Sequence, residues 1–285
     1  MEYSTDDIAA ARSLQFTMYI YASMTTFWTY DYVCSLHEEL TFLLRSHWTK
    51  MKVLYIVTRY LPFIILVTGL YRSFVPNENT GKCRVLDNIE LDLGVVLVIC
   101  SECFFIFRTY VLWEKNRILL AAMLSTLFIS LVASFGITST AAAAAAYATS
   151  AVPGITGCYR KSSNYRLFIP FILLFVFELG LLMLTLIRAI HDWRTNQNRL
   201  YAVLVNHNVF YYACGLLFSV ANIITSLVLQ YFCHSVSYDF QFIILAILAT
   251  RMHLHLWQTN QHSHGSTGAF MYIPMSDTSF LNVAA

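Results

Sequence analysis

The segment Ile118–Thr138, ILLAAMLSTLFISLVASFGIT, contains no charged residue and is apolar over most of its length. A helix that crosses a bilayer needs about 20 consecutive, mostly apolar residues, so this segment alone predicts a membrane-spanning helix. Six further segments have a similar length and composition. The seven predicted spans are Leu14–Val33, Val53–Phe74, Ile89–Leu112, Ile118–Thr138, Leu167–Ile190, Val209–Tyr231 and Phe240–Leu256.

The composition of the whole chain predicts the same class of protein. Of its 285 residues, 58% are hydrophobic and 12% are charged, whereas a soluble domain carries about 25% charged residues. A water-soluble fold of this length could not hide so much apolar surface. The net charge of +2 is too small to indicate nucleic acid as a partner. We therefore predict an all-α, polytopic helix bundle in the lipid bilayer of the plasma membrane or an endomembrane.

The Lys and Arg residues near the ends of the spans predict the orientation of the bundle, because cytoplasmic loops are enriched in them. With the N-terminus outside, ten of these residues lie near internal span ends and seven near external ends. We therefore predict a receptor-like topology with seven transmembrane helices and the N-terminus outside. Six spans are the alternative, because Leu14–Val33 is only moderately apolar and Phe240–Leu256 is short.

Two polar segments lie outside these spans. Ser35–Lys52 combines charged residues with a short apolar spacing, and we expect it to lie along the membrane surface as an amphipathic helix. Residues 258–285 are polar and are expected to form a disordered cytoplasmic tail. The predicted organisation is a seven-helix transmembrane domain over residues 1–257, followed by that tail.

Two cysteines lie in predicted external loops. Cys83 precedes the third span and Cys158 precedes the fifth. Disulfides persist on the oxidising side of a membrane, so we predict a bridge that ties the entrance of the third helix to the loop before the fifth. Two free thiols are the alternative, and Cys233 in the last external loop is a competing partner.

Several short motifs in the first three predicted helices carry a resemblance to a known family. They are Tyr30-Asp31-Tyr32, Leu36-His37-Glu38-Glu39-Leu40, Arg45-Ser46-His47-Trp48-Thr49, Lys52-Val53-Leu54-Tyr55, Arg59-Tyr60-Leu61-Pro62 and Phe107-Arg108-Thr109-Tyr110-Val111-Leu112-Trp113. With these motifs the chain resembles a large family of multi-pass membrane proteins of basidiomycete fungi. That family is named only for an N-terminal domain of unknown function, here about residues 14–74. The resemblance implies a membrane location and about seven helices, and it supplies no reaction, ligand or catalytic residue.

Three ionisable residues lie well inside predicted spans: Arg59, Glu102 and Glu178. Each costs at least about 2.5–3.5 kcal/mol at a helix centre, so each is a functional hypothesis. The helical rise of about 1.5 Å per residue places all three at a similar depth in the cytoplasmic half. We predict that Arg59 pairs with Glu102, with Glu178 as a second acceptor, and that Asn222 joins this polar network through a hydrogen bond between helices. Both a switch between helices and a structural ion pair fit this pattern.

Arg108 and Tyr110 lie at the predicted cytoplasmic end of the third helix. With Thr109 between them, they loosely resemble the Asp/Glu-Arg-Tyr motif of rhodopsin-like receptors, although Phe107 stands where the acid would be. An interfacial arginine that reaches toward water explains the pattern equally well. We keep both residues as candidates for the end that couples to a cytoplasmic signalling protein.

No enzyme chemistry emerges from the sequence. His253 and His255 are two residues apart, so on a helix they point away from each other and are better read as interfacial residues than as metal ligands. We predict no catalytic residue, metal or cofactor. The favoured function is a receptor-like seven-helix sensor of an extracellular small-molecule or lipid ligand. A lipid-modifying membrane enzyme, and a transporter or structural membrane component, are the alternatives.

Overall fold

The computed structural model describes residues 4–46, 48–74, 80–143, 146–149, 152, 155–160, 168–195, 199–228 and 234–266. Within these ranges lie seven α-helices and one short hairpin, so the predicted all-α bundle gains one small β element. The helices are α1 (Thr5–Arg45), α2 (Lys50–Phe74), α3 (Thr80–Leu112), α4 (Arg117–Ala143), α5 (Ile169–Thr195), α6 (Arg199–Val228) and α7 (His234–Ser266). Strands β1 (Tyr147–Thr149) and β2 (Cys158–Arg160) pair antiparallel.

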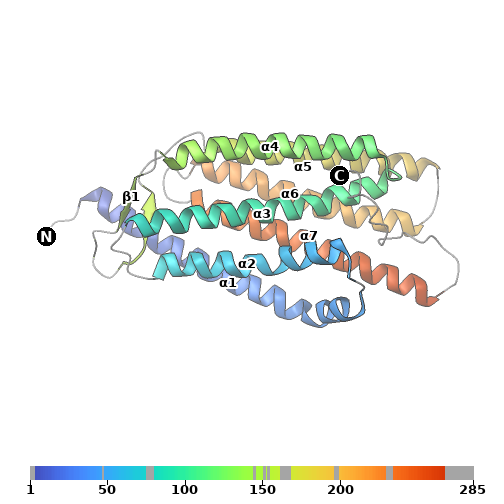
Figure 1. The fold of residues 1–285 in the computed structure, drawn as a ribbon, viewed down its shortest axis with the longest axis horizontal. Coiled ribbons are helices and arrows are strands. Elements are labelled where there is room, and N and C mark those ends of the chain that lie inside the picture. Colours follow the sequence, from blue (N-terminus) through green and yellow to red (C-terminus); the bar gives the residue numbers. More distant parts are fainter. Residues whose placement is uncertain are drawn as a thin grey trace.

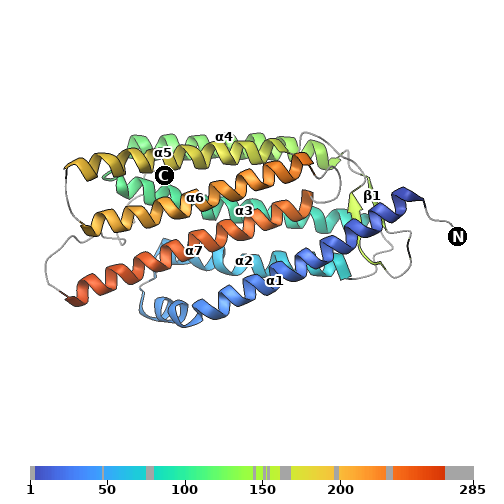
Figure 2. The ribbon, with the colours of Figure 1, turned by 180° about the vertical axis from the view of Figure 1, so that it is seen from behind.

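The helices run along one common axis as an elongated bundle (Figure 1). Successive helices alternate in direction, so α1 begins beside the β1–β2 hairpin and α7 ends at the other end of the molecule (Figure 2). We call these the hairpin end and the opposite end. Helices α1, α2 and α7 pack together on one side and α4 packs on α5 on the other, with α3 in contact with both groups. The outer position of α4 and the central position of α7 follow from this arrangement.

Four helices contain a segment long and apolar enough to cross a membrane. These segments are Lys50–Phe74, Arg117–Thr140, Ile169–His191 and Tyr238–Gln258, and α6 contains a shorter one, Val209–Thr225. Four helices of this kind indicate an integral membrane protein. The number of seven spans and the outside location of the N-terminus remain predictions, because α1 and α3 fall outside this group.

The outer surface of the bundle is apolar. Only 11% of the most apolar window of α4 is buried inside the bundle, against 61% of the window in α7. Large exposed side chains such as Phe128, Ile129 and Val132 cover the outer face of α4. Charged side chains such as Arg59 and Glu102 lie inside instead, at 1% and 0% exposure. This distribution suits a lipid environment, where the surface meets hydrocarbon and ionisable groups face the bundle interior.

Two helices extend beyond the predicted spans. Helix α1 continues through Val33 to Arg45, so the first part of the predicted surface segment Ser35–Lys52 belongs to α1, whose last turns bend away from the bundle axis (Figure 1). At the other terminus, α7 continues to Ser266, so residues 258–266 are helical rather than part of a disordered tail. Residues 267–285 lie outside the described part of the chain.

Candidate functional site

A buried ion cluster joins α1, α2 and α7 around Arg59, and we call it the Arg59 cluster. The Arg59 guanidinium pairs with Asp31 at 2.6 Å (Nη1–Oδ2) and with Glu39 at 2.5 Å (Nη2–Oε1). It also donates to Ser35 Oγ at 2.5 Å. From α7, Arg251 Nη2 reaches Asp31 Oδ1 at 2.8 Å. Two guanidinium groups therefore meet two carboxylates, so the cluster is formally neutral.

The spacing of polar residues on α1 explains this cluster. Asp31, Ser35 and Glu39 recur every four residues, and side chains four apart lie on the same face of an α-helix. Ser35 Oγ donates to Glu39 Oε1 at 2.8 Å, which connects the stripe along the helix. Because α1 does not end at Val33, all three residues face α2 and meet Arg59.

The predicted pairing of Arg59 with Glu102 is wrong. The two residues do lie in neighbouring helices that pack together, α2 and α3, but the guanidinium is occupied by Asp31 and Glu39. The prediction compared depth along the helices only. Depth does not say which way a side chain points around the helix axis, and the presumed end of the first helix removed Glu39 from consideration.

Glu178 belongs to a separate hydrogen-bond chain across α5, α6 and α7, which we call the Glu178 chain. Ser219 Oγ donates to Glu178 Oε2 at 2.7 Å. Gln241 Nε2 donates to Ser219 Oγ at 2.8 Å, and Asn222 Nδ2 donates to Gln241 Oε1 at 2.9 Å. All of these side chains are buried. Glu178 and Asn222 thus lie in one network, and Arg59 lies in another.

Glu102 lies beside the Glu178 chain. It is fully buried, and neither carboxylate oxygen has a hydrogen-bond partner among the residues that the structure describes. It is close enough to Glu178 for the two carboxyl groups to interact electrostatically. Within the described ranges, neither acid forms an ion pair with a basic residue. Two acids therefore lie near each other in the bundle without a cation.

A pocket of about 500 Å³ lies between α3, α4, α5 and α7. It extends from the hairpin end, at Arg84 and Ser139, to Leu127 and Phe177 deeper in the bundle. Most of its wall is apolar, and its volume is in the range of small-molecule sites. Its polar lining consists of Arg84, Asn88, Asp92, Ser130, Ser134, Thr138, Ser139 and Gln241.

Gln241 connects the pocket to the Glu178 chain. Its side chain lines the pocket and also donates to Ser219, which in turn donates to Glu178. A molecule in the pocket therefore lies two hydrogen bonds from a buried carboxylate. Gln241 thus links the cavity to the buried Glu178 carboxylate.

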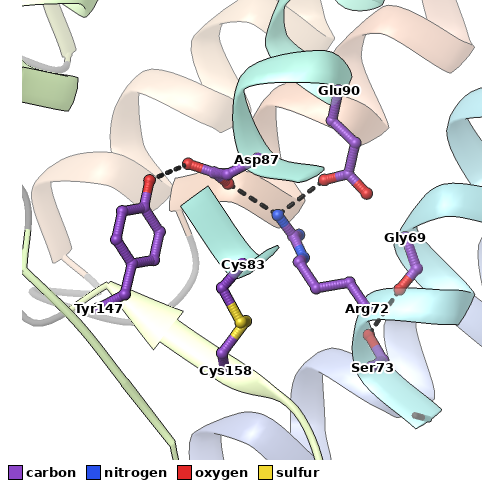
Figure 3. The surroundings of a disulfide bond; sticks show 8 residues. All are labelled: Gly69, Arg72, Ser73, Cys83, Asp87, Glu90, Tyr147 and Cys158. Atoms are coloured by element: carbon purple, nitrogen blue, oxygen red, sulfur yellow. Dashed lines mark hydrogen bonds and ion pairs between the residues drawn. A yellow bond between two sulfur atoms is a disulfide. The ribbon is translucent and has the colours of Figure 1, made fainter. Parts of the chain in front are cut away.

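A second ion cluster, the Arg72 cluster, lies at the hairpin end (Figure 3). Arg72 Nη1 pairs with Asp87 Oδ1 and Glu90 Oε2, both at 2.7 Å. Arg72 Nη2 donates to the Tyr21 hydroxyl at 2.8 Å, and that hydroxyl donates to the Asp239 carboxylate. These contacts tie α1, α2, α3 and α7 together at the end where Arg84 lines the pocket.

A disulfide between Cys83 and Cys158 lies beside the Arg72 cluster (Figure 3). It joins the first turn of α3 to β2, and it is the pair that the sequence analysis selected. The Tyr147 hydroxyl of β1 donates to Asp87 Oδ2 at 2.8 Å, so both strands are anchored to α3. Cys233 lies outside the described residues. The hairpin is thereby fixed near Arg84, which lines the pocket.

Arg108 and Tyr110 lie at the opposite end of α3. Arg108 Nη1 donates to the backbone oxygen of Met252 in α7 at 3.5 Å, and Tyr110 is buried in the apolar core. Between them, the Thr109 hydroxyl lies 3.0 Å from the Tyr212 hydroxyl of α6. This end of α3 therefore contacts both α6 and α7, two of the three helices that carry the Glu178 chain.

His253 is buried rather than interfacial, which corrects the sequence interpretation. It is 4% exposed and packs against the rings of Phe42, Tyr55 and Phe104. No group of three or more His, Cys, Asp or Glu residues able to hold a metal occurs in the described part of the chain.

Sequence reasoning missed several of these residues. In the predicted topology Asp31 lies near the end of the first span, Glu39 lies beyond it, and Arg72 is one of the residues near an external span end. The four-residue spacing of Asp31, Ser35 and Glu39 was a readable signal of a continuing helix face. For Gln241 no such signal existed, because a single glutamine near the start of a span does not reveal its neighbours.

A family model described as a family of unknown function (DUF6533) matches residues 19–64. This segment lies within the predicted signature of about residues 14–74 and contains Asp31, Glu39 and Arg59. No curated protein and no solved structure matches the chain. The comparisons therefore relate the α1–α2 part of the chain, including most of the Arg59 cluster, to a domain of unknown function.

Proposed function

We propose that this protein is a receptor-like, seven-helix membrane sensor with its N-terminus outside. In this proposal a small-molecule or lipid ligand enters the pocket at the hairpin end and changes the arrangement of the helices at the opposite end. The observation that carries the proposal is the position of Gln241, which lines the pocket and begins the hydrogen-bond path to Glu178.

The orientation is supported by the disulfide. Disulfides persist on the oxidising face of a membrane, and Cys83–Cys158 lies at the hairpin end. The hairpin end is therefore assigned to the outside, together with the mouth of the pocket. Arg108 and the end of α7 then face the cytoplasm, where a signalling protein would bind. A multi-pass architecture for the whole family is part of the same proposal.

The coupling follows from the polar groups next to the pocket. A ligand shifts a conformational equilibrium only if it binds the two states with different free energies. Reorienting the Gln241 amide changes the hydrogen bond to Ser219, and this alters the support of Glu178 in the interior. Glu178 and Glu102 come from α5 and α3, so their mutual position depends on the packing of those helices.

Distances between spin labels at the opposite end test the proposal. Labels are placed at Lys50→Cys on α2 and His191→Cys on α5, both exposed positions, in protein whose exposed Cys34 is replaced by Ala. A total lipid extract of the expressing cells should change the distance distribution in nanodiscs. Leu131→Trp, which fills the pocket, should abolish the change.

Gln241→Leu separates coupling from binding. It should leave extract components bound to the purified protein, as detected by mass spectrometry, while the distance change is lost. An unchanged distribution in protein with an intact pocket contradicts the sensor proposal. So does a change that persists in Leu131→Trp.

A transporter is the second candidate, and Glu102 is the observation that favours it. A buried carboxyl group without a partner among the described residues is typical of proton or ion pathways in membranes. Proton or amine flux into vesicles that contain the protein, lost in Glu102→Gln, would support transport over sensing.

A further inference from the structure

The lining of the pocket is long. On α3 it runs from Arg84 to Val98, and on α4 from Leu127 to Ser139. At a rise of about 1.5 Å per residue these stretches are roughly 20 Å long. A largely apolar lining of this length suits a hydrocarbon chain.

A polar stripe on α3 leads into this space. Arg84, Asn88 and Asp92 recur every four residues, all line the pocket and all are exposed. Asp92 is the deepest of the three. No hydrogen bond or ion pair involves its carboxylate among the described residues, although it faces a wall that includes Val95 and Phe242. A carboxylate inside a predicted span and beside apolar walls is stabilised by a cation.

We propose that the pocket takes a single-chain amphiphile with an ammonium head group. The ammonium would pair with the Asp92 carboxylate, and the chain would run toward Leu131 and Phe177. This inference rests on the proposed function, since it names the ligand class of the same pocket. Unlike the sensor proposal, it specifies a positively charged head group and a single hydrocarbon chain for the ligand.

The position of Arg84 agrees with a cation at Asp92. Arg84 lies two helical turns nearer the hairpin end, about 12 Å along the axis, and its guanidinium lies 6.0 Å from the ring centroid of Tyr147. It therefore belongs to the mouth of the pocket and the hairpin. An anionic head group at Arg84 would leave the Asp92 carboxylate without a counter-charge.

Photoaffinity labelling tests the proposal in the full-length protein in neutral-lipid nanodiscs. The probe is octylamine with a photoreactive group on its chain, and the labelled peptides are identified by mass spectrometry. Octylamine, octanol and octanoate compete as unlabelled ligands. Labelling should fall on α3, α4, α5 or α7. Octylamine should compete at up to about fivefold lower concentration than octanol, because an exposed charge pair increases affinity by up to about that factor.

Three variants make the test specific. Asp92→Asn should raise the octylamine concentration needed by up to about fivefold and leave octanol unchanged. Asp92→Glu keeps the charge and should retain the preference for the amine. Leu131→Trp should weaken all three competitors. With decylamine in place of octylamine, affinity should rise about fourfold per methylene.

The outcomes separate this inference from the sensor proposal. Octanoate competing as well as octylamine, or an Asp92→Asn protein that keeps the amine preference, overturns the ammonium assignment. Absence of labelling in the pocket overturns the amphiphile inference, whereas the sensor proposal is decided by the spin-label distances. Amine-selective labelling without any distance change at the opposite end supports the ligand class and contradicts the sensor.

Discussion

The Arg59 cluster and the Glu102–Glu178 region both place carboxyl groups inside the bundle, but they stabilise them in opposite ways. Glu39 is 1% exposed and lies 2.5 Å from the Arg59 guanidinium. Glu102 is 0% exposed, and its oxygens have no hydrogen-bond partner in the described part of the chain. In the Arg59 cluster, carboxylates are paired with guanidinium groups. In the Glu102–Glu178 region, neither acid pairs with a basic residue among those that the structure describes.

This difference separates a structural role from a functional one. A matched buried ion pair fixes the register of two helices, and breaking it leaves an uncompensated charge. A buried carboxyl group without a partner lowers stability, and such departures from good packing concentrate at functional sites. The comparison therefore assigns α1 and α2 to the scaffold around Arg59, with α7 attached to it through the more exposed Arg251. It assigns the contact of α3, α5 and α6 to the moving part.

Arg59→Met should have the largest effect. It leaves Asp31 and Glu39 buried without their shared cation, so the free energy of unfolding should fall by about 3–5 kcal/mol. The measurement is unfolding of the purified protein by a denaturing detergent. A triple variant that adds Asp31→Asn and Glu39→Gln removes the stranded charges and should recover part of the loss. Equal stability of Arg59→Met and the unaltered protein would remove the scaffold role.

Paired neutralisation of Glu39 and Glu102 tests the comparison directly. Glu39→Gln weakens a charged hydrogen bond to Arg59 and should cost about 2 kcal/mol. Glu102→Gln removes an acid that has no partner among the described residues, so stability should stay equal or rise. Both variants change one oxygen to an amide nitrogen, which makes each the steric control of the other. A larger loss for Glu102→Gln would reverse the assignment of the two regions.

Ser219→Ala tests how rigid the Glu178 chain is. The change removes the hydroxyl that connects Gln241 to Glu178. Hydrogen bonds between membrane helices are worth about 0.6 kcal/mol on average and at most about 1.7, so we expect a loss near 1 kcal/mol in the same unfolding assay. A loss comparable to that of Arg59→Met would show that this chain is also scaffold.

The sequence predicted the helical class and the approximate position of each helix, because long uncharged segments such as Ile118–Thr138 have one stable solution in lipid. It also identified the Cys83 and Cys158 pair, because that prediction needed only two loops on the oxidising side of the membrane. The bundle interior was harder. Helical rise placed Arg59 and Glu102 at one depth, but partner choice depends on rotation about each helix axis.

The pocket lay beyond sequence reasoning for a related reason. Its lining comes from four helices, and residues such as Asp92 and Gln241 become neighbours of one cavity only through packing. Asp92 lay inside a predicted span and was available as a signal, since an acid there is costly. The sequence did not reveal the cavity next to Asp92, because the distance between helices cannot be derived from the residue pattern of any single helix.

Arg251→Gln should have the smallest effect, and it defines where the scaffold ends. Arg251 shares Asp31 with Arg59, at 2.8 Å from Oδ1, but its side chain is 32% exposed against 1% for Arg59. Exposed ion pairs contribute about 0.2–1 kcal/mol, and Asp31 keeps its contact with Arg59 when Arg251 is lost. We expect a loss below about 1 kcal/mol, reduced further at high salt because exposed pairs are screened. A loss as large as that of Arg59→Met would mean that the Arg59 cluster holds α7 as firmly as it holds α1 and α2. A ligand acting through Gln241 could then not move α7 without breaking the Arg59 cluster.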